Sequence, residues 1–251
     1  MAIVKYTDRM GPYGDLGDFY NPQSLMVNEA ESTEKKIIYD DVESTNRIVL
    51  TGNNLGYTNN VVDEGTITGI KFTNHDNQNY VVLTGGNYSA QAFSAAFEAD
   101  GIHGMLELAL KGDDKMVGSL TADVLYSGSG NDNVKGGSDD DYIYGGKGDD
   151  KLFGDAGADY LFGDIGNDTM EGGAQSDIFH FRKGTGKDTI TDFDADGNNQ
   201  DFLNLVKGEN FTVKQVNNDD LRLDFGNGDT LLLLDVDKGD FSKADYHYAM
   251  V

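Results

Sequence analysis

The sequence contains no cysteine, so neither a disulfide nor a thiolate-bound metal can stabilise this protein. Its four histidines are scattered and no His-Glu-x-x-His motif is present, which argues against a zinc hydrolase. Positive charge is scarce, with 19 Lys and Arg against 44 Asp and Glu and a formal net charge of −25. This excess of negative charge argues against nucleic acid and anionic membranes as partners, and it favours cations.

Long apolar runs are also absent. The first ten residues, MAIVKYTDRM, lack the apolar stretch of a cleavable signal peptide, and no segment is long enough to span a membrane. Taken alone, these absences would indicate the cytoplasm. A hydrophobic content of 38%, with 13 Tyr and 13 Phe, predicts a folded chain and not a disordered one.

Residues 1–117 predict a β-rich region. Four segments rich in β-branched and aromatic residues are separated by turn sequences, and each predicts a strand: KKIIYD, RIVLTG, TITGIKFT and YVVLTGG. Short helices are expected near 89–110, the first after the N-cap Ser89 and the second over 102–110. We expect this region to pack on the rest of the chain as one body.

A nine-residue repeat begins near Gly118. Aspartate recurs at every ninth position, at Asp123, Asp132, Asp141, Asp150, Asp159, Asp168 and Asp177. An apolar residue follows each aspartate by two positions, at Leu125, Val134, Ile143, Leu152, Leu161, Met170 and Phe179. An imperfect copy follows after a two-residue slip and contains Gly184, Gly186, Asp188 and Ile190.

Each repeat predicts six turn residues and then three strand residues, of which the middle one is buried. Glycine suits the turns because several positions there need a positive φ, and Asp155 and Asp164 replace it with a residue that tolerates this region. Strands this short need stacked neighbours, as in a parallel β-solenoid. The predicted fold is mainly β: a right-handed parallel β-roll at 118–191, between the β-rich region 1–117 and a β-stranded cap at 192–251.

Two repeats make one coil, so aspartates eighteen residues apart form a column on one edge of the roll. One column holds Asp132, Asp150 and Asp168, and the other holds Asp123, Asp141, Asp159 and Asp177. Coils lie about 4.8 Å apart, and two carboxylates at that distance repel by roughly 3–4 kcal/mol at an effective dielectric near 20. Residues 127–180 hold twelve acidic residues and three lysines, so a metal must offset the repulsion. Calcium, with oxygen ligands at about 2.3–2.6 Å, spans this gap better than magnesium.

The pattern Gly-Gly-x-Gly-x-Asp-x-(aliphatic)-x resembles the repeat of the RTX family of calcium-binding β-roll proteins. The resemblance covers about residues 118–190 and implies Ca²⁺ between same-side turns, held by the motif aspartates and main-chain carbonyls. It implies about four to six ions in the roll. The implied pairs are Asp132 with Asp150, Asp150 with Asp168, Asp141 with Asp159, and Asp159 with Asp177, with edge pairs Asp123–Asp141 and Asp168–Asp188. The implied turn glycines are Gly128, Gly130, Gly137, Gly146, Gly148, Gly157 and Gly166.

Three residues depart from the repeat. Ser127 replaces a first-position glycine, and Asp139 and Gln175 replace fourth-position glycines. We expect weaker binding or altered ligation in their coils.

The stretch GTGKDTITDFDADGNNQDFLNL resembles the segment that ends many RTX rolls. The resemblance implies type I secretion through an uncleaved C-terminal signal in residues 192–251, and therefore an extracellular protein. The same stretch places Asp192, Asp194, Asp196 and Gly197 at positions one, three, five and six of an EF-hand-like loop, with Leu203 at position twelve. Two interpretations stay open for residues 192–203: one more calcium site, or a polar turn that caps the roll.

The two outer faces of the roll differ in composition. One face is aromatic and carries Tyr142, Tyr144, Tyr160 and Phe162, while the other is mostly polar. The aromatic face is either covered by another part of the chain or is a platform that binds a sugar or a surface. His180, on the same face, is expected to pack and not to ligate.

The sequence therefore predicts a secreted calcium-binding protein whose roll folds on binding Ca²⁺. We expect it to be a binding, adhesion or matrix protein that contacts exopolysaccharide or a cell surface. The alternative is a small polysaccharide-active enzyme or an accessory module of one. No Gly-x-Ser-x-Gly elbow, metalloprotease motif or paired catalytic acids are evident, which favours a non-enzyme. Ice binding would need a regular row of threonines, and only Thr169 lies on the polar face.

Overall fold

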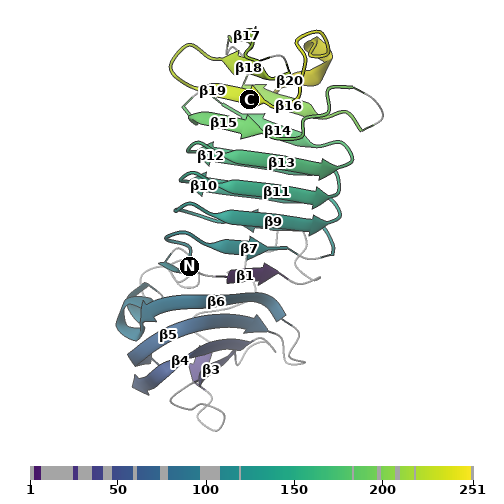
Figure 1. The fold of residues 1–251 in the computed structure, drawn as a ribbon. Coiled ribbons are helices and arrows are strands. Elements are labelled where there is room, and N and C mark those ends of the chain that lie inside the picture. The colour runs from purple at the N-terminus through teal and green to yellow at the C-terminus, as the bar shows by residue number, and fades with distance from the viewer. Residues whose placement is uncertain are drawn as a thin grey trace. The chain divides into compact units, whose positions relative to one another are not determined.

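The computed structural model describes residues 3–6, 25–27, 36–41, 47–58, 61–73, 79–96, 108–118, 120–182, 184–196, 199–206, 210–217 and 219–249. The chain divides into two compact units, Met1–Asp114 and Lys115–Val251. Both units are built mainly from strands, which are drawn as arrows in Figure 1. The mainly β fold class is confirmed.

The first unit contains an antiparallel sheet. All four predicted strand segments are present. A strand also occurs at residues 3–6, IVKY. The short strand β2 was not predicted, because its three residues show no period. In spatial order the sheet is β1 (Ile3–Tyr6), β6 (Asn79–Ser89), β5 (Val61–Thr73), β4 (Arg47–Thr58), β3 (Lys36–Asp41) and β2 (Leu25–Val27).

A helix over residues 90–96 follows this sheet. Its predicted N-cap is confirmed, because the Oγ of Ser89 accepts a hydrogen bond from the backbone N–H of Ala92 at 3.1 Å. Ala90 and Phe93 are buried on its inner side, together with Ile67 and Ile70 of the sheet. The second predicted helix, at 102–110, lies mostly outside the described residues.

The second unit contains the roll, whose strands form two parallel sheets (Figure 1). Residues eighteen apart are paired in register, for example Ile143 with Leu161 and Leu152 with Met170. Two repeats therefore make one coil, as predicted. One sheet contains β7 (Lys115–Val117), β9 (Asn133–Ser138), β11 (Lys151–Ala156), β13 (Thr169–Ala174) and β15 (Lys187–Ile190). The other contains β8 (Val124–Tyr126), β10 (Tyr142–Lys147), β12 (Tyr160–Ile165) and β14 (Ile178–Phe181).

The core of the roll consists of two files of apolar side chains, one from each sheet. All seven predicted core residues are at most 1% exposed. The strands are longer than the predicted three residues, because the first turn residues also pair with the next coil, as in Gly146 with Asp164. Five of the strands, β9 to β13, are six residues long.

The C-terminal strands extend both sheets of the roll. β16 (Phe202–Val206) pairs in parallel with β14 and is followed by β20 (Tyr246–Ala249), while β19 (Thr230–Leu233) pairs in parallel with β15. β18 (Leu221–Asp224) and β17 (Thr212–Gln215) then continue from β19 as antiparallel strands. Across the described residues, no helix combines the length and apolar character needed to cross a membrane.

Candidate metal centre

The predicted aspartate columns are present and buried. Asp123, Asp132, Asp141, Asp150, Asp159, Asp168, Asp177 and Asp188 are each at most 3% exposed. In each predicted pair, the Oδ1 of the later aspartate accepts a hydrogen bond from the backbone N–H of the earlier one. This distance is 2.7 Å from Asp141 N to Asp159 Oδ1 and 2.8 Å from Asp150 N to Asp168 Oδ1. The coils therefore bring together the residues that the repeat pairs.

Five of these aspartates have a second carboxylate oxygen without a donor among the described residues. They are the buried Oδ2 atoms of Asp141, Asp150, Asp159, Asp168 and Asp177. A buried polar atom without a partner costs about 1–3 kcal/mol, and more when it is charged. The columns therefore need either protons or cations.

A glycine lies beside each of these Oδ2 atoms, and at Gly136, Gly145 and Gly154 a main-chain carbonyl of the next coil approaches the same point. A Cβ added at Gly154 would lie 2.3 Å from Asp159 Oδ2 and 2.4 Å from the carbonyl oxygen of Gly172 in the next coil. At Gly136 the same distances are 2.3 Å to Asp141 Oδ2 and 2.7 Å to Gly154 O. A carboxylate oxygen and a main-chain carbonyl thus approach one point, and Ca²⁺ can bridge oxygens up to about 5.2 Å apart.

This donor set fits Ca²⁺. Within the described ranges no three Asp, Glu or His side chains converge on one point, so side chains alone do not form a metal site. Main-chain carbonyls would have to complete the coordination. Calcium accepts carboxylate and carbonyl oxygens in flexible geometry, whereas magnesium demands a near-ideal octahedron.

Electrostatics within the columns oppose ionisation. Burial raises the pKa of Asp141 to about 8, and the charges of Asp159 and Asp123 add to the rise. Burial also raises the pKa of Asp177 to about 8 and that of Asp150 to about 7. Both effects penalise the charged form, so a cation that neutralises the column relieves them.

These pKa values predict that acid stabilises the calcium-free roll. A carboxyl group whose folded pKa is raised from 3.8 to about 8, such as Asp141, binds protons more tightly in the folded state. Its contribution to stability is complete below about pH 4 and is lost as the pH rises through 6 to 8. We expect the roll in chelator to keep more β structure at pH 5 than at pH 8.5, as measured by far-UV circular dichroism, and Asp141→Asn to reduce that difference. A β signal in chelator that rises with pH would contradict this assignment.

A comparison with known protein families identifies the repeats that carry these columns. The model of the RTX calcium-binding nonapeptide repeat matches in overlapping segments between residues 109 and 190. These residues are RTX calcium-binding repeats. We therefore call the coils of strands β7 to β15 the RTX roll.

Two solved structures resemble part of this chain at low identity. The extracellular lipase LipA from Serratia marcescens is 18% identical with a TM-score of 0.31, and the match covers 55% of this chain and 38% of the lipase. A subunit of the mannuronan C5-epimerase from Azotobacter vinelandii is 24% identical with a TM-score of 0.35, and the match covers 55% of this chain and 80% of that subunit. No curated protein sequence matches the chain.

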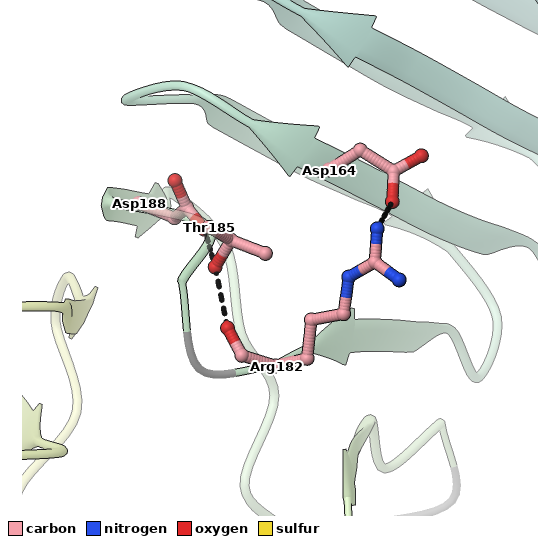
Figure 2. Close-up of polar contacts among 4 residues, drawn as sticks. All are labelled: Asp164, Arg182, Thr185 and Asp188. Carbon is pink, nitrogen blue, oxygen red and sulfur yellow. Dashed lines mark hydrogen bonds and ion pairs between the residues drawn. The ribbon is translucent and has the colours of Figure 1, made fainter.

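At the end of each aspartate column of the RTX roll, protein groups act as donors to both carboxylate oxygens of the last aspartate. The Oδ1 of Asp188 accepts from the N–H of Asp168 at 3.0 Å, and its Oδ2 lies 3.4 Å from the hydroxyl of Thr185. Figure 2 shows Thr185 between Asp188 and the carbonyl of Arg182, which its hydroxyl reaches at 2.8 Å. The guanidinium of Arg182 also pairs with Asp164 at 2.8 Å. The longer turn at 182–188 therefore supplies donors that the regular turns lack.

The other column ends at Asp201, which the repeat did not predict. Asp201 is 3% exposed, and its Oδ1 accepts from the N–H of Asp177 at 2.9 Å. Its Oδ2 accepts from the N–H of Asp194 at 2.9 Å. The sequence signal that could have found Asp201 is an aspartate followed by an apolar residue two positions later, as in the repeat. Here the apolar residue is Leu203, which is fully buried. Asp229 and Leu231 form a similar triplet, and Asp229 accepts from the N–H of Gly184 at 2.7 Å.

Most of the turn residues adopt the predicted backbone conformation. A positive φ occurs at six of the seven implied glycines and not at Gly166. Asp155 and Asp164 have φ of 69° and 65°, which confirms that aspartate replaces glycine there. The departing residues Asp139 and Gln175 also have positive φ, at 71° and 82°. Ser127 is fully buried, and its hydroxyl donates to the carbonyl of Gly145 at 2.8 Å.

In the EF-hand-like loop at 192–203, aspartate carboxylates accept hydrogen bonds from backbone N–H groups. The carboxylate of Asp192 accepts from the N–H groups of Gly172 and Gly173 at 2.9 and 2.8 Å. The Oδ1 of Asp194 accepts from the N–H of Asp196 at 3.1 Å. Gly197 lies outside the described residues. A calcium site at 192–203 stays a prediction.

The aromatic residues form ladders along the outer face of β8, β10, β12 and β14. Tyr126 stacks on Tyr144 at 4.4 Å between ring centroids, and Tyr144 stacks on Phe162 at 4.4 Å. Tyr142 stacks on Tyr160 at 4.5 Å. His180 continues the first ladder at 4.9 Å, so its packing role is confirmed. Because the rings cover one another's faces, mainly ring edges and hydroxyl groups remain to meet a ligand.

Proposed function

We propose that the RTX roll is a calcium-triggered folding unit of an extracellular binding protein. About four to six Ca²⁺ ions would occupy the two aspartate columns, each between aspartates eighteen residues apart and completed by main-chain carbonyls. The observation that carries this proposal is the series of five buried Oδ2 atoms without a donor. Bound calcium supplies the positive charge that these atoms lack, and its binding energy adds to the folding energy.

The proposed location follows from the same coupling. RTX repeats are characteristic of secreted proteins. At low cytosolic calcium the charged columns would keep the roll expanded, which suits export by a type I system that recognises residues 192–251. At the millimolar calcium outside the cell the columns would fill and the roll would close. The loop at 192–203 could take one further ion.

The proposed role outside the cell is binding to a polysaccharide or a cell surface. The aromatic face, with Tyr142, Tyr144, Tyr160 and Phe162, carries no charged side chain at its outward strand positions next to the core file. Three strand residues across four strands form a strip of about 10 by 20 Å. That is small against the roughly 800 Å² per partner of a stable protein interface, and it suits a linear chain.

The second candidate function is an accessory module of a polysaccharide-active enzyme. A strip that binds a linear chain would serve either role. Release of reducing or unsaturated ends from a polysaccharide by the calcium-loaded protein would favour this candidate.

Terbium binding tests the proposed metal sites. Tb³⁺ replaces Ca²⁺ at oxygen sites, and because the chain has no Trp, tyrosine is its sensitiser. We expect tyrosine-sensitised Tb³⁺ emission that excess Ca²⁺ removes and Mg²⁺ does not. The double variant Asp141→Asn/Asp159→Asn should lose emission from that column, whereas Asp240→Asn, an exposed position, should keep it. Equal emission from all three proteins would sink the column assignment.

A further inference from the structure

Charged side chains are distributed unevenly around the RTX roll. The carboxylates lie mainly on the turns, and the outward positions of the aromatic face next to the core carry no charged side chain. The outer face of β7, β9, β11 and β13 carries the lysines, and we call it the lysine face: Lys115, Asn133, Lys135, Lys151 and Thr169, with Phe153 and Glu171 beside them. Three cations thus gather on one face of a chain with a net charge of −25.

Two of these lysines have no acidic partner among the described residues. Lys135 lies 3.8 Å from Asp155 and 5.1 Å from the ring centroid of Phe153. Lys115 and Lys151 are exposed, and neither forms an ion pair within the part of the chain that the structure describes. Carboxylates outnumber basic residues by 44 to 19, so unpaired lysines are unexpected here.

The register fixes the spacing of the two unpaired lysines. Lys115 pairs with Asn133, and Asn133 pairs with Lys151, so the three residues form one column along the roll. Two strand spacings separate the lysines by about 9.6 Å at the backbone. Asn133 lies between them, and Thr169 continues the column beside Lys151. The column thus alternates ammonium groups with an amide and ends on a hydroxyl.

Calcium would reverse the sign of the charge behind this face. Residues 115–191 contain 7 Lys and Arg and 14 Asp and Glu, a formal net charge of −7. About four divalent ions suffice to make this segment positive. Without calcium this segment is negative and, by the proposed function, expanded; with calcium the lysine face forms on a positive roll. An anion would be repelled in the first state and attracted in the second.

We propose that the lysine face binds a linear carboxylated polysaccharide, and that it does so only when the roll is loaded with calcium. The inference rests on the proposed calcium loading of the roll, and it adds a binding face on the sheet opposite the aromatic face. Lys115 and Lys151 pair with carboxylates, and Asn133 and Thr169 bind sugar hydroxyls. The face is about 10 Å wide and is bordered by turns with exposed carboxylates, such as those of Asp140 and Asp149, so it admits a single chain and disfavours a nucleic acid duplex.

The test measures binding of a fluorescent hexagalacturonate to the full chain by anisotropy, in excess calcium and in chelator. We expect binding in calcium alone, and no binding of a neutral dextran oligomer. Lys115→Gln/Lys151→Gln should weaken binding about tenfold, as expected for two exposed ion pairs. The matched control Lys147→Gln/Lys238→Gln removes the same charge from exposed positions off this face and should change binding less than twofold. Circular dichroism in calcium verifies that both variants fold.

Equal weakening by the two double variants would overturn the assignment of the site to this face. Equal binding in calcium and chelator would overturn the calcium gate. Tighter binding of duplex DNA or of phosphatidylserine vesicles would overturn the partner class. If terbium emission appears as expected and the hexagalacturonate does not bind, this inference fails while the proposed function stands. If terbium emission is absent, the proposed function fails first.

Discussion

Chelation of calcium is expected to remove most of the β structure of the RTX roll. Five buried Oδ2 atoms would then lack any partner. At about 1–3 kcal/mol for each such atom, the total approaches the whole stability of a typical domain, about 5–15 kcal/mol. Hydrogen exchange should show loss of protection in β9 to β13, and far-UV circular dichroism should show less β signal.

The first unit provides an internal control for this experiment. Its long strands β4 and β5 contain no repeat aspartates, so their amides should keep their protection after chelation. Calcium should restore the roll and magnesium should not, because the columns offer carbonyl-rich sites in flexible geometry. Retained protection in β10 to β12 after thorough chelation would rule out folding coupled to calcium.

The sequence predicts the roll well because each half-coil depends on few residues. One buried side chain, one column aspartate and the turn glycines determine each repeat, so a period of nine is sufficient to place Leu152 and Leu161 in the core. The columns follow from the same period. The pairing of Asp150 with Asp168 across eighteen residues is a direct consequence of two repeats per coil.

The ends of the columns could not be predicted in the same way. Asp201 follows Asp177 by 24 residues, and the length of the intervening loop is not set by the repeat. The donors that close the columns, Thr185 and the N–H of Asp194, lie on irregular turns whose conformation depends on tertiary contacts. Likewise, β19 pairs with β15 across some forty residues of chain, a long-range contact that no local pattern specifies.

The two outer faces of the roll illustrate a second limit of prediction from the sequence. Alternation along each strand predicted which residues point outward, including Tyr142 and Tyr160. It did not predict that their rings stack with an interplanar angle of 1°, since ring orientation depends on side-chain torsions. Stacking determines that edges and hydroxyl groups are presented, and not ring faces. Similarly, the strand register shows that Lys115 and Lys151 share a column. Composition alone does not show this.

Gly154→Ala is expected to destabilise the roll by about 3 kcal/mol and to raise the calcium needed for folding. The added Cβ would lie 2.3 Å from Asp159 Oδ2 and 2.4 Å from Gly172 O. The Asp159 carboxylate is held by the N–H of Asp141, which donates to its Oδ1 at 2.7 Å. Either the carboxylate or the carbonyl must move, and both are proposed calcium ligands. The variant should therefore unfold at lower denaturant concentration and bind Ca²⁺ more weakly, as measured by a calcium titration followed by circular dichroism.

Two other glycines separate this steric effect from the general effects of alanine. Gly239 has no atom within 4 Å of the added Cβ and no positive φ, so Gly239→Ala should leave both stability and the calcium titration unchanged. Gly184 also has open space but a φ of +97°, so Gly184→Ala should cost about 1 kcal/mol through backbone strain alone. Because Gly154 has ordinary backbone geometry, a cost at Gly154 no larger than that at Gly184 would mean that the carboxylate and the carbonyl move apart easily. The two oxygens would then not form a fixed cradle for the ion.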